Sequence, residues 1–158
     1  MIYLLIGAFV CATDLWCKGK IDHTDPKVAR MLHRLPRKYA GGHFQIDCVH
    51  NHGLAFNALD KYPLLPKILS GVIFAAIAIL GIPLLFADGI CSLTKLGLTL
   101  MLGGGASNVT DRLAKGYVVD YMNVQQRPVK KLYFNIGDVS ILLGFLCIIL
   151  RVLLPRKK

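Results

Sequence analysis

Apolar residues gather in four long segments of the chain, and polar residues concentrate in the connections between them. The clearest segment, Ile68 to Ala87, has 20 residues and no formal charge, and a helix that spans a bilayer needs about 20 mostly apolar residues. The first segment is shorter, and no Lys or Arg precedes Lys18 as in a signal peptide. We therefore predict one integral-membrane domain, residues 1–158, with spans at about 1–17, 68–87, 89–110 and 134–155.

Two long polar connections separate these spans. The first covers residues 18–67, and its part from 43 to 57 has short alternating apolar runs broken by Asn51-His52-Gly53. This pattern is typical of a small hairpin or curved sheet. The second connection covers residues 111–133. The predicted fold class is thus an all-α membrane bundle of four transmembrane helices with a small β-sheet at about 43–59.

Composition agrees with a membrane protein. The chain is 54% apolar and only 18% charged, with a net charge of +10; this excludes disorder and disfavours an ordinary soluble domain. Because no recognition module is visible, we predict membrane lipids rather than nucleic acid as partners of the basic charge. Five cysteines without CxxC spacing predict neither a disulfide framework nor a zinc site. His50 and His52 would share one face of a strand, but no third metal ligand is evident, so no metal is predicted.

Charged and amide side chains collect at one end of the predicted spans. Charged groups at membrane depth are costly, which makes each of them a candidate for function. Asp14 and Lys18 lie at i and i+4 and can pair on one helix face. In a four-span bundle the end of span one, the end of span three and the start of span four lie on the same membrane face. The candidates at this face are Asp14, Lys18, Asn108, Asp111, Arg112, Asp120, Asn135 and Asp138.

Convergent carboxylates at an apolar boundary indicate acid–base chemistry. Two neighbouring Asp side chains cannot both ionise cheaply, so they share a proton and titrate as a pair. The charged member then takes a proton from water and the protonated member polarises a carbonyl, as in aspartic proteases. Metal binding and a proton relay are open alternatives for carboxylates that have Lys or Arg nearby.

The same residues also have structural interpretations. Asp14 with Lys18 fits a structural ion pair better than catalysis, and Asp138 near a helix start fits a cap. The Gly103-Gly104-Gly105 run has neither the preceding strand nor the following Lys of a phosphate loop. Close helix packing through small residues is the favoured interpretation of this run.

Four ordered blocks of sequence resemble the lipoprotein signal peptidases, the signal peptidase II family. TDLWCK is similar to the family's Asp-x-x-x-Lys, and NHGLAFN is close to Asn-x-Gly-x-Ala-Phe. GGGASNVTDRLAKGYVVDYM matches Gly-x-x-x-Asn-x-x-Asp-Arg followed by Val-Val-Asp-Phe, and FNIGD is similar to Phe-Asn-x-Ala-Asp. The blocks occur in the family's order, and together they make a specific resemblance over nearly the whole chain.

The resemblance implies four transmembrane helices in the bacterial inner (cytoplasmic) membrane, and an extracytoplasmic sheet that cradles the substrate beside the active site. It implies an aspartic endopeptidase that removes signal peptides from prolipoproteins, just before a diacylglyceryl-modified cysteine, with no metal or organic cofactor. Asp120 and Asp138 match the catalytic pair. The residues that match positions shaping the site and holding the substrate are Asp14, Lys18, Asn51, Asn108, Asp111, Arg112 and Asn135. The partners expected are the lipidated prolipoprotein and membrane lipids, and the chain is expected to be a monomer.

Two features depart from the family pattern. Gly137 stands where the family has Ala before the last Asp, and we expect this exchange to loosen the packing. The basic stretch from 20 to 42 has no match in the pattern. The alternative functions are a proton-coupled four-span transporter and an inactive relative that binds lipidated peptides. Transporters place such acids near the bilayer midplane, whereas these lie at span ends.

The distribution of basic residues and the family resemblance predict opposite orientations of the chain in the membrane. An even number of spans puts both termini on one side with five of the 19 basic residues, and the long connections on the other side with the rest. The positive-inside rule would place those connections in the cytoplasm. The resemblance places them outside, and it takes precedence because the rule is statistical. The C-terminus is then predicted to be cytoplasmic.

Overall fold

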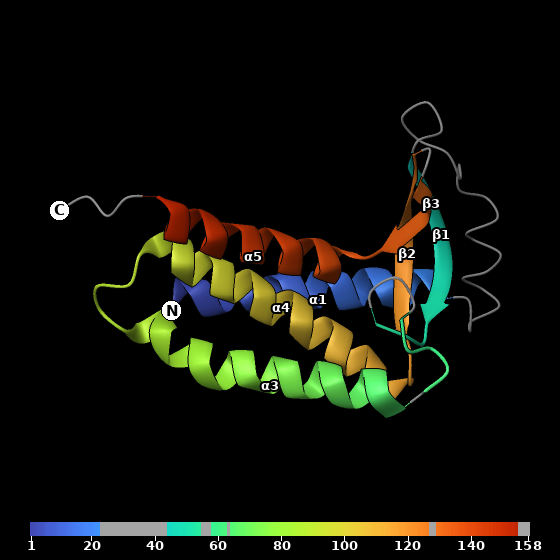
Figure 1. Ribbon diagram of the computed structural model, residues 1–158, viewed down its shortest axis with the longest axis horizontal. Helices are drawn as coiled ribbons and strands as arrows, with labels where there is room; N and C mark the ends of the chain where they lie inside the picture. The colour runs from blue at the N-terminus through green and yellow to red at the C-terminus, as the bar shows by residue number, and fades with distance from the viewer. Residues whose placement is uncertain (23–43, 55–57, 63, 127–128, 155–158) are drawn as a thin grey trace.

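Four helices and a small sheet make up the described part of the protein. The computed structural model describes residues 1–22, 44–54, 58–62, 64–126 and 129–154. The helices are α1 (Ile2–Ile21), α3 (Leu64–Phe86), α4 (Ser92–Ala114) and α5 (Ile136–Leu153). They lie side by side along the long axis, and the sheet lies across one end (Figure 1). The start of α1 and the end of α5 both lie at the opposite end of the bundle.

Three of these helices, α1, α3 and α5, are long and apolar enough to cross a membrane. Their outward faces are apolar as well: Ile79 and Leu80 of α3 are each 72% exposed, and so is Phe9 of α1. Such large apolar side chains are stable on an outer face when lipid rather than water surrounds them. The prediction of a membrane-type helical protein is confirmed at this level.

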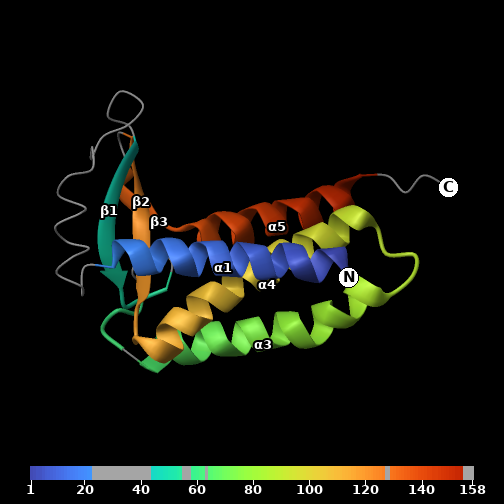
Figure 2. The same cartoon turned by 180° about the vertical axis from the view of Figure 1, so that it is seen from behind.

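The helix α4 differs from the other three. It has 23 residues, as α3 does, but it is the more polar of the two. It lies in the middle of the bundle, in contact with α1, α3 and α5 (Figure 2). Its polar side chains therefore face protein, and Thr99, Ser107, Asn108 and Asp111 are all buried. The third predicted span, at about 89–110, is thus present as the helix α4, although length and hydropathy mark only the other three described helices as spans.

Glycines bring α4 to backbone contact with its neighbours. A Cβ atom added at Gly103 would lie 2.6 Å from the carbonyl oxygen of Gly7 in α1. One added at Gly104 would overlap the carbonyl oxygen of Gly137 in α5. These contacts confirm that the Gly103-Gly104-Gly105 run serves close helix packing.

The expectation that Gly137 loosens the packing is wrong. A Cβ atom at this position would lie 2.8 Å from the Oδ2 atom of Asp14 and 3.0 Å from the carbonyl oxygen of Gly104. The missing methyl group therefore lets α5 approach α1 and α4 more closely than an alanine would permit.

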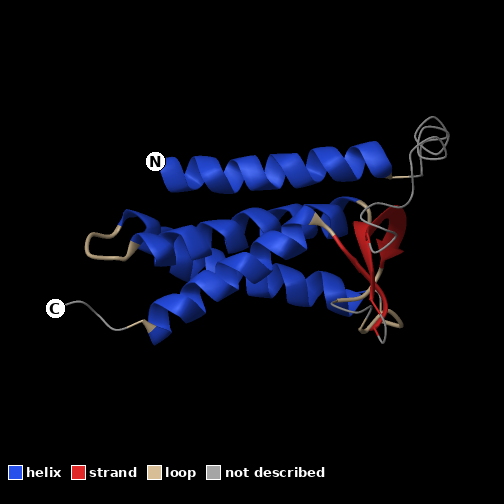
Figure 3. Ribbon diagram, turned by 90° about the horizontal axis from the view of Figure 1, so that it is seen from above, coloured by secondary structure: helices blue, strands red, loops and turns tan. Residues whose placement is uncertain are grey.

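The sheet combines strands from both long connections. It consists of β1 (Phe44–Asn51), β2 (Val118–Gln126) and β3 (Val129–Phe134). All neighbours are antiparallel, in the order β1-β2-β3, and the sheet stands across the ends of the helices (Figure 3).

The strand pairing differs from the expected hairpin within residues 43–59. In the part of this stretch that the structure describes, 44–51 forms one strand, and its partner is β2. Asn51 pairs with Val118 and Val49 pairs with Asp120. The alternating pattern predicted the strand β1 but not its partner, because pairing joins segments that are far apart in sequence. The consequence for the site is that Asn51 and Asp120 come to adjacent strands.

We expect the variant Gly104→Ala to destabilise the protein by about 1–3 kcal/mol, as overpacking does in well-packed interiors. The new methyl group would meet the carbonyl oxygen of Gly137 and push α5 away from α4. Gly71→Ala in α3 is the matched control, because a Cβ atom there has no neighbour within 4 Å. Thermal unfolding in detergent measures both variants, and equal unfolding temperatures would contradict this packing.

Candidate active site

Two aspartates from different elements line one cavity. Asp120 lies on β2 and is only 2% exposed, and Asp138 lies in the first turn of α5. The cavity has a volume of about 440 Å³. Its lining residues are Asn51, Leu54, Asn108, Arg112, Val118, Asp120, Leu132, Tyr133, Phe134, Asp138, Ile141, Leu142 and Phe145. Five of the predicted site residues, from β1, α4, β2 and α5, therefore meet at this cavity.

Three asparagine amides donate hydrogen bonds to the two carboxylates. The Nδ2 atom of Asn135 lies 2.8 Å from Oδ1 of Asp120, and that of Asn51 lies 3.0 Å from Oδ2. The Nδ2 atom of Asn108 lies 2.8 Å from Oδ1 of Asp138. Each carboxylate is thus held by side chains from other elements, which limits its rotation within the cavity.

Hydrogen bonds to the amide oxygens explain why the NH₂ groups point toward the carboxylates. The Oδ1 atom of Asn108 accepts a hydrogen bond from Lys18 (2.7 Å), and that of Asn51 accepts one from the backbone N–H of Gly53 (2.9 Å). An oxygen held by a donor leaves the amide NH₂ directed the opposite way, toward the acid. The orientation of Asn108 and Asn51 is therefore set by partners that do not line the cavity, whereas the Asn135 oxygen is held by the backbone N–H of Asp138.

Asn135 and Asp138 form the N-terminal cap of α5. The Oδ1 atom of Asn135 accepts from the backbone N–H of Asp138 at 2.9 Å, and Oδ2 of Asp138 accepts from the backbone N–H of Asn135 at 3.2 Å. This reciprocal capping box satisfies two N–H groups at the helix start. The predicted capping role of Asp138 is confirmed, and it leaves the Oδ1 atom of Asp138 for Asn108.

A fully buried lysine connects α1 to α4. The helix α1 continues to Ile21, so Lys18 stays on the helix one turn after Asp14 and pairs with it at 2.7 Å. Lys18 also donates to Ser107 (3.0 Å) and lies 3.4 Å from Oδ2 of Asp111. Lys18 and Asp14 are both 0% exposed. The predicted ion pair is confirmed, and it is part of a larger buried polar cluster.

Two members of this cluster escaped the sequence analysis. Ser107 donates to Oδ2 of Asp14 at 2.6 Å, and the Tyr121 hydroxyl donates to Oδ1 at 2.9 Å. The Tyr121 oxygen in turn accepts from the backbone N–H of Ile136 at 3.2 Å. Tyr121 directly follows Asp120, but no local pattern distinguishes its hydroxyl from that of a surface tyrosine. Both contacts join residues far apart in sequence.

Arg112 connects the cavity to the segment after β1. Its guanidinium donates to the carbonyl oxygen of Gly53 at 2.7 Å, and Gly53 also holds the Asn51 amide. Its Nε atom is buried without a hydrogen-bond partner among the described residues. Arg112 thus fixes the position of Asn51 and keeps an unused donor next to the cavity.

Burial and charge both act on Asp120. Burial and then the charge of the neighbouring Asp138 raise the pKa of Asp120, which reaches about 6 once the opposing interactions are included. The hydrogen bonds from Asn51 and Asn135 partly oppose this rise because they favour the charged carboxylate. Asp120 therefore exchanges its proton close to neutral pH, where an acid–base group is most effective.

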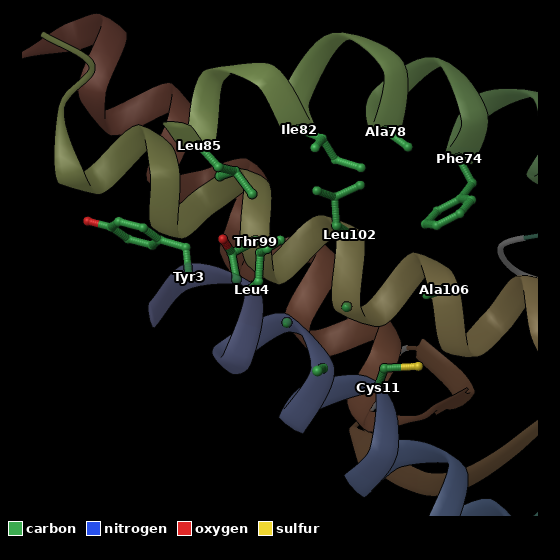
Figure 4. Close-up of a pocket in the computed structure, with 13 residues that line it drawn as sticks. Tyr3, Leu4, Cys11, Phe74, Ala78, Ile82, Leu85, Thr99, Leu102 and Ala106 are labelled. Atoms are coloured by element: carbon green, nitrogen blue, oxygen red, sulfur yellow. The ribbon is translucent and has the colours of Figure 1, made fainter. Parts of the chain in front are cut away.

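A second cavity lies in the bundle, away from the acid pair. It has a volume of about 290 Å³ and lies between α1, α3 and α4. Figure 4 shows Cys11, Phe74, Ile82 and Leu102 around it. Its lining has no charged side chain and no carboxylate, so it is not a candidate for the paired-acid site.

Fold and site together define a class: a helical membrane-type protein with a small antiparallel sheet and a polar cavity that contains two acids. The family model for signal peptidase (SPase) II matches residues 6–154. The chain therefore belongs to the signal peptidase II family, which is a family of proteases.

Curated relatives agree with this assignment. The lipoprotein signal peptidase of Moorella thermoacetica is 34% identical over 156 residues, which cover 98% of this chain and 95% of that protein. The lipoprotein signal peptidase of Solibacter usitatus is 28% identical over 155 residues, which cover 97% of this chain and 91% of that protein.

Two solved structures of a bacterial membrane enzyme have a similar fold. One, at 2.3 Å resolution, has a TM-score of 0.74 at 23% identity and covers 96% of this chain and 87% of that chain. The other, at 1.9 Å resolution, has a TM-score of 0.71 at 21% identity and covers 98% and 94%. At these identities the likeness concerns the fold.

The raised pKa of Asp120 predicts a stability that falls as pH rises. The folded protein holds this proton more tightly than the unfolded chain, so the favourable contribution is present below about pH 4 and is lost as pH rises through about 6. The upper limit is about 3 kcal/mol for a shift of this size. Unfolding of wild type and Asp120→Asn should be compared across this range. A pH dependence of stability that is the same in both proteins would contradict the raised pKa of Asp120.

Proposed function

We propose that the protein is an intramembrane aspartyl endopeptidase that removes signal peptides from diacylglyceryl-modified prolipoproteins, cleaving just before the lipidated cysteine. Family membership supports the removal of signal peptides from lipoproteins. The observation that carries the mechanism is that Asp120 and Asp138 line one cavity, with asparagine donors on both carboxylates. The catalytic pair is therefore Asp120 and Asp138.

The pair acts on a water molecule and the scissile carbonyl. One carboxylate, ionised, takes a proton from the water as it attacks, and the other, protonated, donates a hydrogen bond to the carbonyl oxygen. The raised pKa of Asp120 supports a proton that the pair shares near neutral pH. The asparagine donors keep both carboxylates in place while charge moves between them.

Arg112 and Asn51 hold the substrate backbone beside the acids. Both line the cavity, and the guanidinium of Arg112 carries N–H donors that suit a peptide carbonyl. Fixing the peptide at this point orients the scissile bond for attack. Asp14, Lys18 and Asp111 act one step further away, because they fix the amide of Asn108 and the position of α4.

In this proposal the substrate enters the cavity from the lipid side. Part of its wall is apolar and comes from α5, where Leu142 is 58% exposed and Phe145 is 52% exposed. An apolar signal helix and its lipid chains can therefore reach the acids from the bilayer without entering water. Acids at the end of the bundle place the cleaved bond near the membrane surface.

Replacing Asp120 or Asp138 by Asn is expected to abolish cleavage, by at least about 10²- to 10⁴-fold, because each variant loses a proton-transfer group. The assay follows release of the signal peptide from a diacylglyceryl-modified prolipoprotein in detergent. Asp88→Asn is the matched control, since Asp88 is an exposed residue between α3 and α4. Normal turnover by either site variant would rule out the proposed pair.

The proposal also fixes an orientation. All four helices cross the bacterial inner (cytoplasmic) membrane, with the sheet and the acids near the extracytoplasmic face. The support is that α4, although polar, matches α3 in length and lies between the apolar helices. The helices also begin and end at two opposite ends of one bundle (Figure 1).

A reporter fused after Lys158 tests this orientation. We expect it to read as cytoplasmic, because α1 begins and α5 ends at the end of the bundle away from the sheet. A second reporter, inserted between α3 and α4 at Asp88, should also read as cytoplasmic. Reporters that read on opposite sides would contradict four crossings, and two extracytoplasmic signals would invert the orientation.

A further inference from the structure

A second group of polar side chains lies where α1 meets the sheet. The end of α1 lies beside β1 (Figure 2). Asp22 follows the last residue of α1, and Cys48 and His50 lie on β1. One ligand atom from each, a carboxylate oxygen, a thiol sulfur and a ring nitrogen, lies within 4.8 Å of the others. The acid pair Asp120 and Asp138 is not part of this group.

We propose that Asp22, Cys48 and His50 form a binding site for Zn²⁺. Zinc in proteins is bound by thiolate, imidazole and carboxylate, which are the three donors present here. The sequence offered His50 without a sufficient set of partners, and the fold supplies Asp22 from 28 residues away. The proposal departs from the prediction that no metal is bound, and it is independent of the proposed peptidase activity.

The geometry is close to what the ion requires. The Nε2 atom of His50 lies 3.1 Å from Oδ1 of Asp22, and ligand atoms of tetrahedral zinc are separated by about 3.4–3.7 Å. On binding, the ion takes the place of the proton between these two atoms, and that proton moves to Nδ1, so that His50 binds as the neutral imidazole. A shift of about 1 Å at most brings the Cys48 sulfur to the same separation, which a small side-chain rotation allows.

Neighbouring groups prepare both His50 and Asp22. The ring of Tyr117 stacks on His50 with centroids 4.1 Å apart, which fixes the plane of the imidazole. Lys115 pairs with Oδ2 of Asp22 at 3.2 Å, so it occupies the other carboxylate oxygen and leaves Oδ1 toward His50. Such supporting contacts orient metal ligands in known sites.

Charge and access also fit the ion. The Cys48 thiolate and the Asp22 carboxylate neutralise the two charges of Zn²⁺, and the thiol proton leaves to solvent on binding. Three protein ligands leave one position for water. The His50 side chain is 32% exposed, so the ion has a path to the site. Bound metal would cross-link the end of α1 to β1, the strand that carries Asn51.

The test is zinc binding to the purified, tag-free full chain in detergent. Zn²⁺ alone is titrated against a chromophoric chelator, and we expect one tightly bound ion per chain. Cys48→Ser and His50→Gln should each weaken binding by at least about tenfold, because even outer-shell changes at metal sites cost about 10- to 100-fold. Cys91→Ser and His52→Gln are the matched controls and should bind as wild type does.

Cobalt binding provides a second measurement. It uses the wild-type protein, so the result does not depend on whether a variant folds. Co²⁺ bound at this site should show a thiolate-to-cobalt charge-transfer band and the strong visible absorption of a tetrahedral ion. Zinc should also raise the unfolding temperature of wild type but not that of Cys48→Ser. An octahedral, thiolate-free cobalt spectrum would overturn the proposal. So would equal zinc affinity in wild type and both ligand variants, or no binding to wild type.

Discussion

A lysine with no contact to water is the constraint on which this end of the molecule depends. Lys18 is 0% exposed, and an unpaired ammonium group in such a place would cost several kcal/mol. Its donors must therefore find acceptors within the protein. Asp14 comes from the same helix, but Ser107, Asn108 and Asp111 come from α4. The requirement to satisfy Lys18 thus sets the rotation of α1 against α4.

Asp138 receives its orientation through this cluster, and the same cluster connects the sheet to α5. Lys18 donates a hydrogen bond to the Oδ1 atom of Asn108, and the Nδ2 atom of the same amide donates one to Asp138. Asp14 holds the Tyr121 hydroxyl, which accepts from the first N–H of α5 and so connects the sheet to that helix. A buried polar network of this kind is stable only when each member has its partner. The hydrogen bonds and ion pairs of this network therefore stabilise the fold, and they also order the side chains that line the cavity.

Polar side chains lie inside the helix bundle of this protein, and apolar side chains lie on its outer face. The central helix α4 carries the polar residues and the glycines, whereas α3 carries apolar side chains on an exposed face. Lipid favours this arrangement because it has no water to satisfy a polar group. Backbone contact at Gly104 and Gly137 brings α4 and α5 close enough for Asn108 to reach Asp138. The close packing of α4 against α5 therefore also determines the geometry of the site.

The sequence by itself determined the four helical segments to within a few residues, and it identified each acid and amide that the site contains. Hydrophobic length and i, i+4 spacing are local properties, so they can be read without a structure. Only the tertiary structure decided that β1 pairs with β2, that Tyr121 and Ser107 hold Asp14, and that Asp22 lies beside Cys48 and His50. These contacts join distant segments, and no local pattern specifies which segments meet, because the meeting depends on how the whole chain buries its polar and apolar groups at once.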